Sequence, residues 1–482
     1  MTRILAVQLS SKEIMNHSFD SSAHADAFLL FGATGDLARK KLFPALYELT
    51  LEGRLDMPVI GIARRPLTDD ELRQRVRDSI LETVGKSADE NAINQLCSHV
   101  RYLSGNYTDR DTFAKLNEMT GGAKVPVSFL AIPPSLFDDV VEGMAAAGMC
   151  ERGRVVVEKP FGRDLESAKE LNAVLHRHLR ETQIFRIDHF LGKEPVQNLL
   201  VFRFANSIME PIWNRNHIKS VSITMAESFG IEGRGKFYES VGTIRDVVQN
   251  HLLQMVALLA MEPPSSKDPR ALRDEKVKVF RAIKSVEPEE VIRGQFEGYR
   301  QEEGVDPKSD IETYAALKLE IESWRWAGVP FYIRAGKGMA QTLTEAVIEF
   351  EQPPRMLFAE ENQLPKPNRL TFQMKPDEFI TLGMQAKVPG MAMISRDVDL
   401  SVDYEAALGG DAPDAYQRLI ADSLVGDERL FARQDGVEEA WRIIEPILKP
   451  TRYVLPYKFG SWGPEAANAY FPPTDDANDR SV

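Results

Sequence analysis

The chain has 482 residues, which is more than one ordinary domain holds and enough for two or three domains that each bury a core. Its 72 acidic and 59 basic residues give a net charge of −13, so neither nucleic acid nor an anionic membrane is an expected partner. Its two cysteines exclude a disulfide framework and a cysteine zinc site, and they favour a reducing cytoplasm, with no metal expected.

The first predicted part of the chain is a flexible extension over residues 1–25. Its apolar stretch, residues 4–7, is short for a secretory signal, although Ala23-His24-Ala25 resembles a cleavage site. The longest apolar run of the chain, about residues 255–261, is far too short to span a membrane. We therefore expect a cytoplasmic protein.

Between residues 26 and 190, short apolar runs alternate with amphipathic, helix-like segments. The runs are 28–31, 59–63, 100–103, 127–132 and 155–157. This alternation is typical of βα units in a parallel sheet. We predict a Rossmann-like dinucleotide-binding domain over 26–190.

The first βα turn of that domain is a G-x-x-G-x-x-A form of the dinucleotide fingerprint. Small residues there let backbone amides approach a pyrophosphate at a helix N-terminus. At the end of the second strand, where an NAD site places an acid, Arg64 and Arg65 suit a 2′-phosphate, so NADP is the predicted cofactor. The alternative is a solvated basic turn. The turn consists of Gly32, Ala33, Thr34, Gly35, Asp36, Leu37 and Ala38.

Two later motifs of this domain also follow predicted strands. Pro133 and Pro134 fix one loop, and Lys159 precedes Pro160 in the other. Proline restrains the backbone before it, so Lys159 is placed to direct its ammonium at substrate or cofactor. A cis peptide and a merely exposed lysine are both open alternatives here.

The stretch Arg186-Ile187-Asp188-His189-Phe190-Leu191-Gly192-Lys193-Glu194 concentrates ionisable groups. Asp188, His189 and Lys193 lie within six residues, between an apolar strand and Pro195, a favoured first residue of a helix. Cations at the end of a strand and the start of a helix form an anion site. A solvated turn is the alternative interpretation.

After residue 190 the hydrophobic period changes to two. Val221, Ile223 and Met225, and later Leu317, Leu319 and Ile321, alternate with polar residues, which is typical of antiparallel strands with one solvated face. Helical stretches at about 236–261 and 412–424 are interleaved with them. We predict an α+β domain over 191–482, built on a large, mainly antiparallel sheet.

His251 lies on the first of these helical stretches. A lone histidine beside leucines is usually a packed core residue. Asp246 is five residues away, about 140° around an α-helix, and so is poorly placed to orient this imidazole. Asp188 is the better candidate, and the pair would act as a base and its carboxylate partner without a serine or cysteine nucleophile.

From about Phe28 to nearly its end, the chain resembles the glucose-6-phosphate dehydrogenase family. The shared stretches are GATGDLA, EKPFG, RIDHFLGKE, WNRNHI, RDVVQNH, LLAMEPP, RWAGVPFYIRAGK and GSWGPEAA. The resemblance implies that His251 is the general base for the C1 hydroxyl of glucose 6-phosphate and that Asp188 orients it. It also implies hydride transfer to NADP at the turn Gly32–Ala38 with Arg64, and a homodimer or homotetramer built on the large sheet.

The resemblance assigns further side chains to the sugar phosphate. His189 and Lys193 match residues that hold the phosphate. The positions that match residues lining substrate or cofactor are Lys159, Glu227, Asp246 and Lys337.

Three positions depart from the family pattern. Phe190 stands where a tyrosine is usual, Thr342 where a lysine or arginine contacts substrate, and Glu239 where an aspartate is common. Each lost hydrogen bond to a charged group would cost about 1.5 to 3 kcal/mol. Two alternatives therefore stay open: a related dehydrogenase for another aldose or sugar phosphate, and a non-catalytic NADP-binding protein.

Overall fold

The computed structural model describes residues 24–355, 358, 366–409, 412–449 and 453–472. These form two compact units, the first made of residues 24–131, 142–156 and 420–427 and the second of the remaining described residues. The predicted extension over 1–25 lies almost entirely outside the described residues. The predicted domain boundary at residue 190 stays a prediction.

A six-stranded sheet with the order β3-β2-β1-β4-β5-β6 contains the predicted βα units. β1 pairs in parallel with β2 and β4, and β2 pairs in parallel with β3. Strands β1, β2 and β4 are buried along their whole length, which explains why they are continuous apolar runs. The strands are β1 Ala27–Phe31, β2 Val59–Ala63, β3 Val100–Ser104, β4 Pro126–Leu130, β5 Arg154–Glu158 and β6 Ile184–Ile187.

Helices follow these strands, as the alternation predicts. Several begin at a side chain that accepts a backbone N–H of the first turn: Thr68, Asp89, Asp109 and Asp164. Thr68, Asp109 and Asp164 thereby end the loops that follow β2, β3 and β5, whereas Asp89 begins α3 after α2. The helices are α1 Phe43–Leu51, α2 Asp69–Val84, α3 Glu90–His99, α4 Arg110–Met119, α5 Phe137–Ala146 and α6 Leu165–His176.

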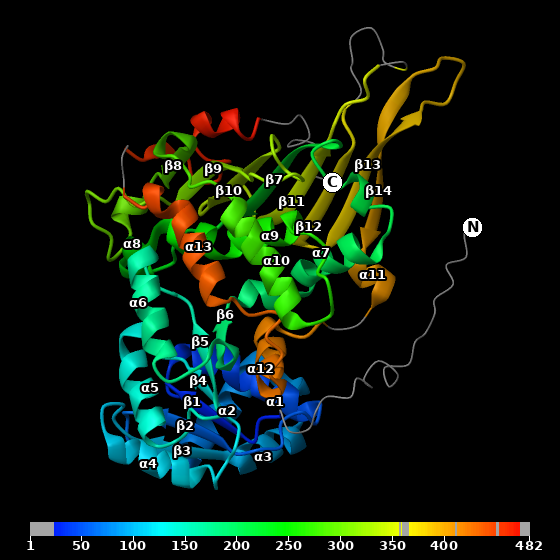
Figure 1. Cartoon of the computed structure of the whole chain (residues 1–482). Coiled ribbons are helices and arrows are strands. Elements are labelled where there is room, and N and C mark those ends of the chain that lie inside the picture. The colour runs from blue at the N-terminus through cyan, green and yellow to red at the C-terminus, as the bar shows by residue number, and fades with distance from the viewer. Residues whose placement is uncertain (1–23, 356–357, 359–365, 410–411, 450–452, 473–482) are drawn as a thin grey trace. The chain divides into compact units, whose positions relative to one another are not determined.

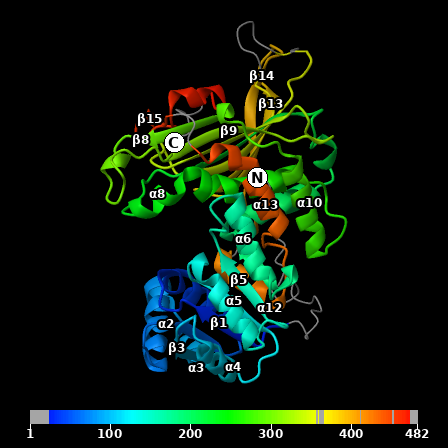
Figure 2. The same ribbon diagram turned by 60° about the vertical axis from the view of Figure 1, so that its left-hand side comes forward.

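The second unit contains a nine-stranded sheet with the order β14-β13-β12-β11-β7-β10-β9-β8-β15 (Figure 1). β10 pairs in parallel with β7 and β15 with β8, and the other neighbours are antiparallel. The hairpin of β13 and β14 extends past the adjoining strands (Figure 2). The strands are β7 Ile218–Ala226, β8 Val291–Phe296, β9 Tyr314–Glu320, β10 Pro330–Gly336, β11 Leu343–Phe350, β12 Arg369–Lys375, β13 Phe379–Lys387, β14 Ser395–Asp403 and β15 Leu455–Tyr457.

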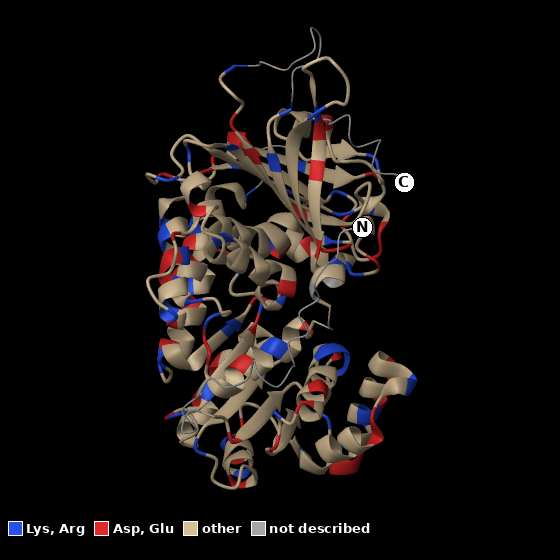
Figure 3. Cartoon of the chain, turned by 90° about the vertical axis from the view of Figure 1, so that its right-hand side faces the viewer, with Lys and Arg blue, Asp and Glu red and all other residues tan. Residues whose placement is uncertain are grey.

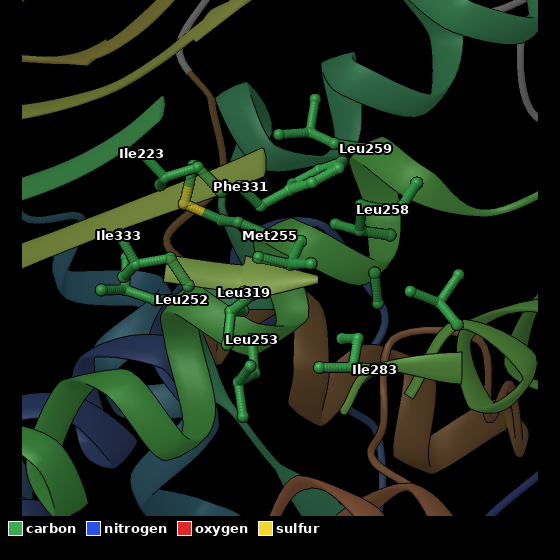
Figure 4. Packing of buried hydrophobic residues seen from close by; sticks show 14 of the residues in the cluster. Ile223, Leu252, Leu253, Met255, Leu258, Leu259, Ile283, Leu319, Phe331 and Ile333 are labelled. Atoms are coloured by element: carbon green, nitrogen blue, oxygen red, sulfur yellow. The ribbon is translucent and has the colours of Figure 1, made fainter. Parts of the chain in front are cut away.

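Helices α7, α9, α10 and α13 cover one face of this sheet (Figure 1). The core between them joins strand residues such as Ile223 and Phe331 to helix residues such as Leu252 and Met255 (Figure 4). No helix among the described residues is long and apolar enough to cross a membrane. In Figure 3, acidic and basic residues are interspersed along the helices. The remaining helices are α7 Glu194–Ala205, α8 Gly235–Thr243, α9 Leu253–Ala260, α10 Pro269–Ala282, α11 Tyr404–Leu408, α12 Ala415–Val425 and α13 Gln434–Ile444.

The predicted helical stretch at 236–261 consists of three segments. α8 contains a break at Gly242, whose φ of 63° and ψ of 176° are not helical. A π-helix then runs over Ile244–Leu252, and α9 completes the stretch. Because a π-helix pairs residues five apart, side chains at i and i+5 lie on nearly the same side, unlike in an α-helix. This changes where Asp246 lies relative to His251.

Candidate active site

The loop after β6 places the first group of predicted site residues. Asp188 caps a short 3₁₀-helix over His189–Gly192, and its Oδ1 accepts the N–H of Phe190 at 3.1 Å. This cap fixes the carboxylate at the strand end and directs it inward, where the residue is only 2% exposed. Lys193 follows the 3₁₀-helix and is the residue directly before α7.

His251, from the π-helix, meets this carboxylate. Its Nδ1 lies 2.5 Å from Asp188 Oδ1, and both side chains are buried. An ionised carboxylate only accepts hydrogen bonds, so Nδ1 carries the proton and Nε2 retains a lone pair. The pair thus has the geometry of an imidazole base oriented by an acid.

Lys159 lies on the other side of the imidazole. Its Nζ is 3.1 Å from His251 Nε2, 3.1 Å from the carbonyl oxygen of Asp246 and 3.5 Å from Asp246 Oδ1. The peptide bond between Lys159 and Pro160 is cis. Asp246 and His251 therefore face the same ammonium, because the π-helix brings residues five apart to one side. The expectation of about 140° between them, which assumed an α-helix, is wrong for this reason.

The buried charges shift the pKa values of these groups. Burial lowers the pKa of His251, and the positive charge of Lys159 lowers it further against the opposing effect of Asp188. Burial alone would raise the pKa of Asp188, but the charge and hydrogen bond of His251 and the charges of His189 and Lys159 hold it below its ordinary value. The site therefore combines a neutral imidazole with an ionised carboxylate at neutral pH.

His189 and Lys193 lie beside this pair. The His189 ring meets the His251 ring edge-on at 4.9 Å and stacks on the Tyr416 ring at 6.2 Å. Burial lowers the pKa of His189 to about 3 and that of Lys193 to about 8. At neutral pH His189 is a neutral hydrogen-bonding group and Lys193 a cation, a combination that suits a phosphate.

Phe190, one of the three departures from the family pattern, contacts both His251 and Lys193. Its ring lies 5.3 Å from the His251 ring, and the Lys193 ammonium lies over its face at 5.0 Å. The side chain is buried, so the ring shapes the site although it offers no hydroxyl. Thr342, another of the departures, contacts Ser228. Its hydroxyl accepts the N–H of Ser228 at 3.1 Å and lies 2.9 Å from the Ser228 hydroxyl.

Lys337 and Glu227 form an ion pair at the ends of β10 and β7. The Lys337 ammonium lies 5.3 Å from the Phe229 ring and 5.9 Å from the Tyr238 ring. The charge of Glu227 also acts on Lys193, which links this pair electrostatically to the other predicted substrate residues. The structure thus gathers all eight predicted catalytic and substrate residues in the second unit.

Glu158 and Tyr416 were missed by the sequence predictions. Burial raises the pKa of Glu158 to about 7, although its hydrogen bond with Tyr416 acts in the opposite direction. Tyr416 in turn stacks on His189. The only sequence signal is the position of Glu158 directly before Lys159, and nothing local connects it to a tyrosine so far along the chain.

Ligand atoms of Asp188, His189 and His251 all lie within 4.8 Å of one another, a spacing that a metal ion could use. The Lys159 ammonium, however, lies directly against His251 Nε2. A divalent cation there would meet a like charge at close range. The arrangement favours acid–base chemistry over metal binding.

The predicted dinucleotide turn lies in the first unit. Gly32 has a φ of 81°, and the N–H of Gly35 is bonded to its carbonyl oxygen at 2.9 Å, which makes a tight turn after β1. A Cβ on Gly61 would lie 2.8 Å from that of Ala33, so Gly61 allows β2 to approach the turn closely. Arg64 and Arg65 follow β2 directly and are exposed. Because β1 and β2 are parallel, the turn and the arginines share one edge, as a pyrophosphate and a 2′-phosphate require.

Comparisons with known proteins find similar sequences over most of the chain. Residues 29–198 match the glucose-6-phosphate dehydrogenase NAD binding domain, and residues 200–477 match the C-terminal domain of that family. The chain is 43% identical to glucose-6-phosphate 1-dehydrogenase 1 of Mycobacterium tuberculosis over 92% of this chain and 94% of that protein. It is 41% identical to glucose-6-phosphate 1-dehydrogenase of Aggregatibacter actinomycetemcomitans, over 91% and 94%.

Two solved structures are similar throughout. The glucose-6-phosphate 1-dehydrogenase of Mycobacterium avium has a TM-score of 0.86 and 45% identity, covering 93% of this chain and 96% of that one. A glucose-6-phosphate dehydrogenase in complex with glucose 6-phosphate has a TM-score of 0.87 and 36% identity, covering 95% and 98%.

Proposed function

Because the chain belongs to the glucose-6-phosphate dehydrogenase family, we propose that it oxidises the C1 hydroxyl of glucose 6-phosphate to 6-phosphogluconolactone, with NADP as hydride acceptor. The observation that carries this proposal is the buried pair of His251 and Asp188, with Nε2 as the available base. Around it lie His189 and Lys193 for a phosphate and Lys159 for the reacting oxygen.

The chemistry of the residues follows from their hydrogen bonds. His251 Nε2 takes the proton of the C1 hydroxyl while the C1 hydrogen leaves with its electron pair, and the C1–O bond becomes a carbonyl. Bound NADP supplies the nicotinamide C4 that accepts this hydride. Asp188 accepts the Nδ1–H and stabilises the imidazolium, and the Lys159 ammonium moves from Nε2 to the developing alkoxide.

The remaining predicted residues serve binding in this proposal. Lys193 and His189 hold the 6-phosphate, one as a cation and the other as a neutral donor. Glu227, Asp246 and Lys337 bind sugar hydroxyls, for which paired carboxylate and ammonium groups supply acceptors and donors.

NADP preference is assigned to the first unit. The backbone of Gly32–Ala38 receives the pyrophosphate, and Arg64 with Arg65 binds the 2′-phosphate. Lys159, which matches a family residue lining substrate or cofactor, is assigned to both ligands in this proposal.

We also propose a homo-oligomer in the cytoplasm. On the β13–β14 hairpin, Met384, Val398, Leu400 and Val402 are exposed, and directly paired residues of the two strands share a face. An exposed apolar face of this kind marks a protein interface, and a second copy of the chain is the expected partner. Cys97 and Cys150 form no disulfide, which fits a reducing compartment.

The proposed function is tested by following NADPH formation with glucose 6-phosphate, free glucose and other hexose phosphates at matched concentrations. Glucose 6-phosphate is expected to give the highest kcat/KM. The departures at Phe190 and Thr342 favour one alternative function, a dehydrogenase for another aldose. A higher kcat/KM with a substrate that lacks the 6-phosphate would establish this alternative. NADP binding without turnover of any sugar would establish a non-catalytic protein instead.

A further inference from the structure

Tyr107 connects the two halves of the proposed dinucleotide site. It lies between β3 and α4 in the first unit and is 4% exposed. Its hydroxyl accepts the N–H of Gly32 at 3.1 Å and donates to the carbonyl oxygen of Ile62 at 3.2 Å. One side chain therefore bonds to the first glycine of the turn after β1 and to the end of β2.

The carbonyl oxygen of Ile62 is a shared acceptor. It also receives the N–H of Gly32 at 2.9 Å and that of Ala33 at 3.3 Å. With the Tyr107 hydroxyl, three donors converge on this oxygen from two segments. These hydrogen bonds connect the end of β2 to the glycine turn, two residues before Arg64.

The ring of Tyr107 carries a second contact. The Arg64 guanidinium lies over the ring at 6.0 Å from its centroid, and Phe31 packs edge-on against the same ring at 5.8 Å. A cation over an aromatic face is attracted to it, and the ring restricts the freedom of the arginine. The N–H groups at the edge of the guanidinium stay available to an anion.

We infer that Tyr107 is a positioning residue of the dinucleotide site, which holds Arg64 at a fixed place relative to the glycine turn and thereby sets the preference for a 2′-phosphate. This inference rests on the proposed function, in which the turn binds pyrophosphate and Arg64 the 2′-phosphate. The spacing between those two phosphates is fixed by the ligand, so a protein that fixes the same spacing loses less freedom on binding.

The hydroxyl and the ring make separable contributions. The hydroxyl supports the turn, which contacts a pyrophosphate common to NAD and NADP. The ring supports Arg64, which contacts a phosphate that only NADP carries. Removing the hydroxyl alone should weaken both ligands alike, whereas removing the ring should weaken NADP more.

Isothermal titration of NADP and of NAD without sugar tests this separation. Tyr107→Phe is expected to weaken both by a similar factor, about threefold to tenfold, and to keep their ratio. Tyr107→Leu is expected to weaken NADP about threefold to fivefold more than NAD. Tyr47→Phe is the matched control, because Tyr47 is a buried tyrosine of the same unit whose hydroxyl accepts the N–H of Asp89 instead. It should change neither affinity.

Hydrogen exchange gives a second readout on the conservative variant, which retains the ring and is expected to fold. In Tyr107→Phe the Gly32 amide keeps its bond to Ile62 but loses the hydroxyl, so it should exchange faster than in the wild type or in Tyr47→Phe, although less fast than an amide without any acceptor. If the exchange rate of the Gly32 amide and the affinities for NADP and NAD are all unchanged in Tyr107→Phe, the role of the hydroxyl is overturned. A folded Tyr107→Leu that keeps the wild-type ratio of NADP to NAD affinity would overturn the role of the ring. If the wild type binds neither dinucleotide, the proposed function fails as well, and this result is distinct from the other two.

Discussion

At the residue scale, burial and the neighbouring charges have opposite effects on the pKa of His251. Burial and the Lys159 ammonium lower its pKa below the ordinary 6.5, while Asp188 raises it. The imidazole is therefore neutral and able to accept a proton over most of the physiological range. The Lys159 ammonium lies 3.1 Å from Nε2, so the proposed reaction requires the substrate hydroxyl to displace it from this nitrogen.

The pH profile of kcat/KM should reflect two groups of the free enzyme. On the acid side, kcat/KM should rise with pH as His251 loses its proton, with a midpoint below 6.5. On the basic side it should fall above about 8, because Lys193 then loses the charge that binds the phosphate. In Lys193→Arg the guanidinium stays charged, so the basic limb should disappear. A basic limb that persists in this variant would assign it to another group.

Replacing the base separates catalysis from binding. His251→Asn should lower kcat about 100-fold to 10,000-fold, because asparagine accepts no proton, while the NADP affinity stays within about twofold. Stopped assays and titration calorimetry measure the two quantities. His217→Asn, at an exposed histidine of the same unit, is the control and should retain full activity. Loss of both turnover and NADP affinity in His251→Asn would indicate misfolding rather than a lost base.

The departures at Phe190 and Thr342 predict a weakened phosphate site. Restoring the missing groups in Phe190→Tyr with Thr342→Lys should lower the KM for glucose 6-phosphate about tenfold or more, since each new hydrogen bond to a charged group contributes about 1.5 to 3 kcal/mol. Thr342→Lys loses the hydrogen bond with Ser228, so the single variants should be compared. A KM that stays constant or rises would mean that the site is already compensated or serves another ligand.

At the element scale, the π-helix over Ile244–Leu252 decides which groups meet. It brings Asp246 and His251 to one ammonium, and its start is fixed by Glu312, which accepts the N–H of Ile244 at 3.1 Å. Gly242 precedes this start with a φ of 63°, and a Cβ there would lie 2.5 Å from Glu312 Oε1. The helix therefore depends on a residue without a side chain.

Gly242→Ala should lower the free energy of unfolding by about 3 kcal/mol and reduce kcat, because both the backbone strain and the overlap with Glu312 displace the π-helix. Gly233→Ala is the control. Gly233 also has a positive φ, 75°, but nothing lies within 4 Å of the added Cβ, so its cost should be about 1 kcal/mol. Urea unfolding measures both. Equal costs for the two variants would mean that Glu312 moves aside freely.

The strands could be predicted closely because burial on both faces leaves continuous apolar runs, as in β1 and β2. The sequence correctly favours Asp188 over Asp246 as the partner of His251, but this preference assumes an α-helix where the chain forms a π-helix. The π-helix was not predictable, since its residues have the same hydrophobic pattern as an α-helix. Glu158 with Tyr416, and Tyr107 with Gly32, depend on hydrogen bonds between distant segments, for which the local sequence holds no signal.

At the scale of the whole molecule, the exposed apolar residues of the β13–β14 hairpin support the proposed self-association. Val398, Leu400 and Val402 alternate with acidic and hydroxyl residues along β14, so one face is apolar and the other polar. Leu400 is directly paired with Leu382 and is 58% exposed in the single chain. Water contact on this face is unfavourable unless a second copy covers it.

Leu400→Asp should therefore shift the proposed dimer toward monomer, because it would place an unpaired carboxylate in an apolar interface that symmetry repeats in the partner. Sedimentation velocity over a range of concentrations measures the shift. Ser401→Asp adds the same charge at the next position, on the opposite face of the strand, and should leave the dimer intact. If the dimers of both variants dissociate to the same extent, the added charge disturbs the strand rather than the apolar face. If neither dimer dissociates, the subunits contact each other at another surface.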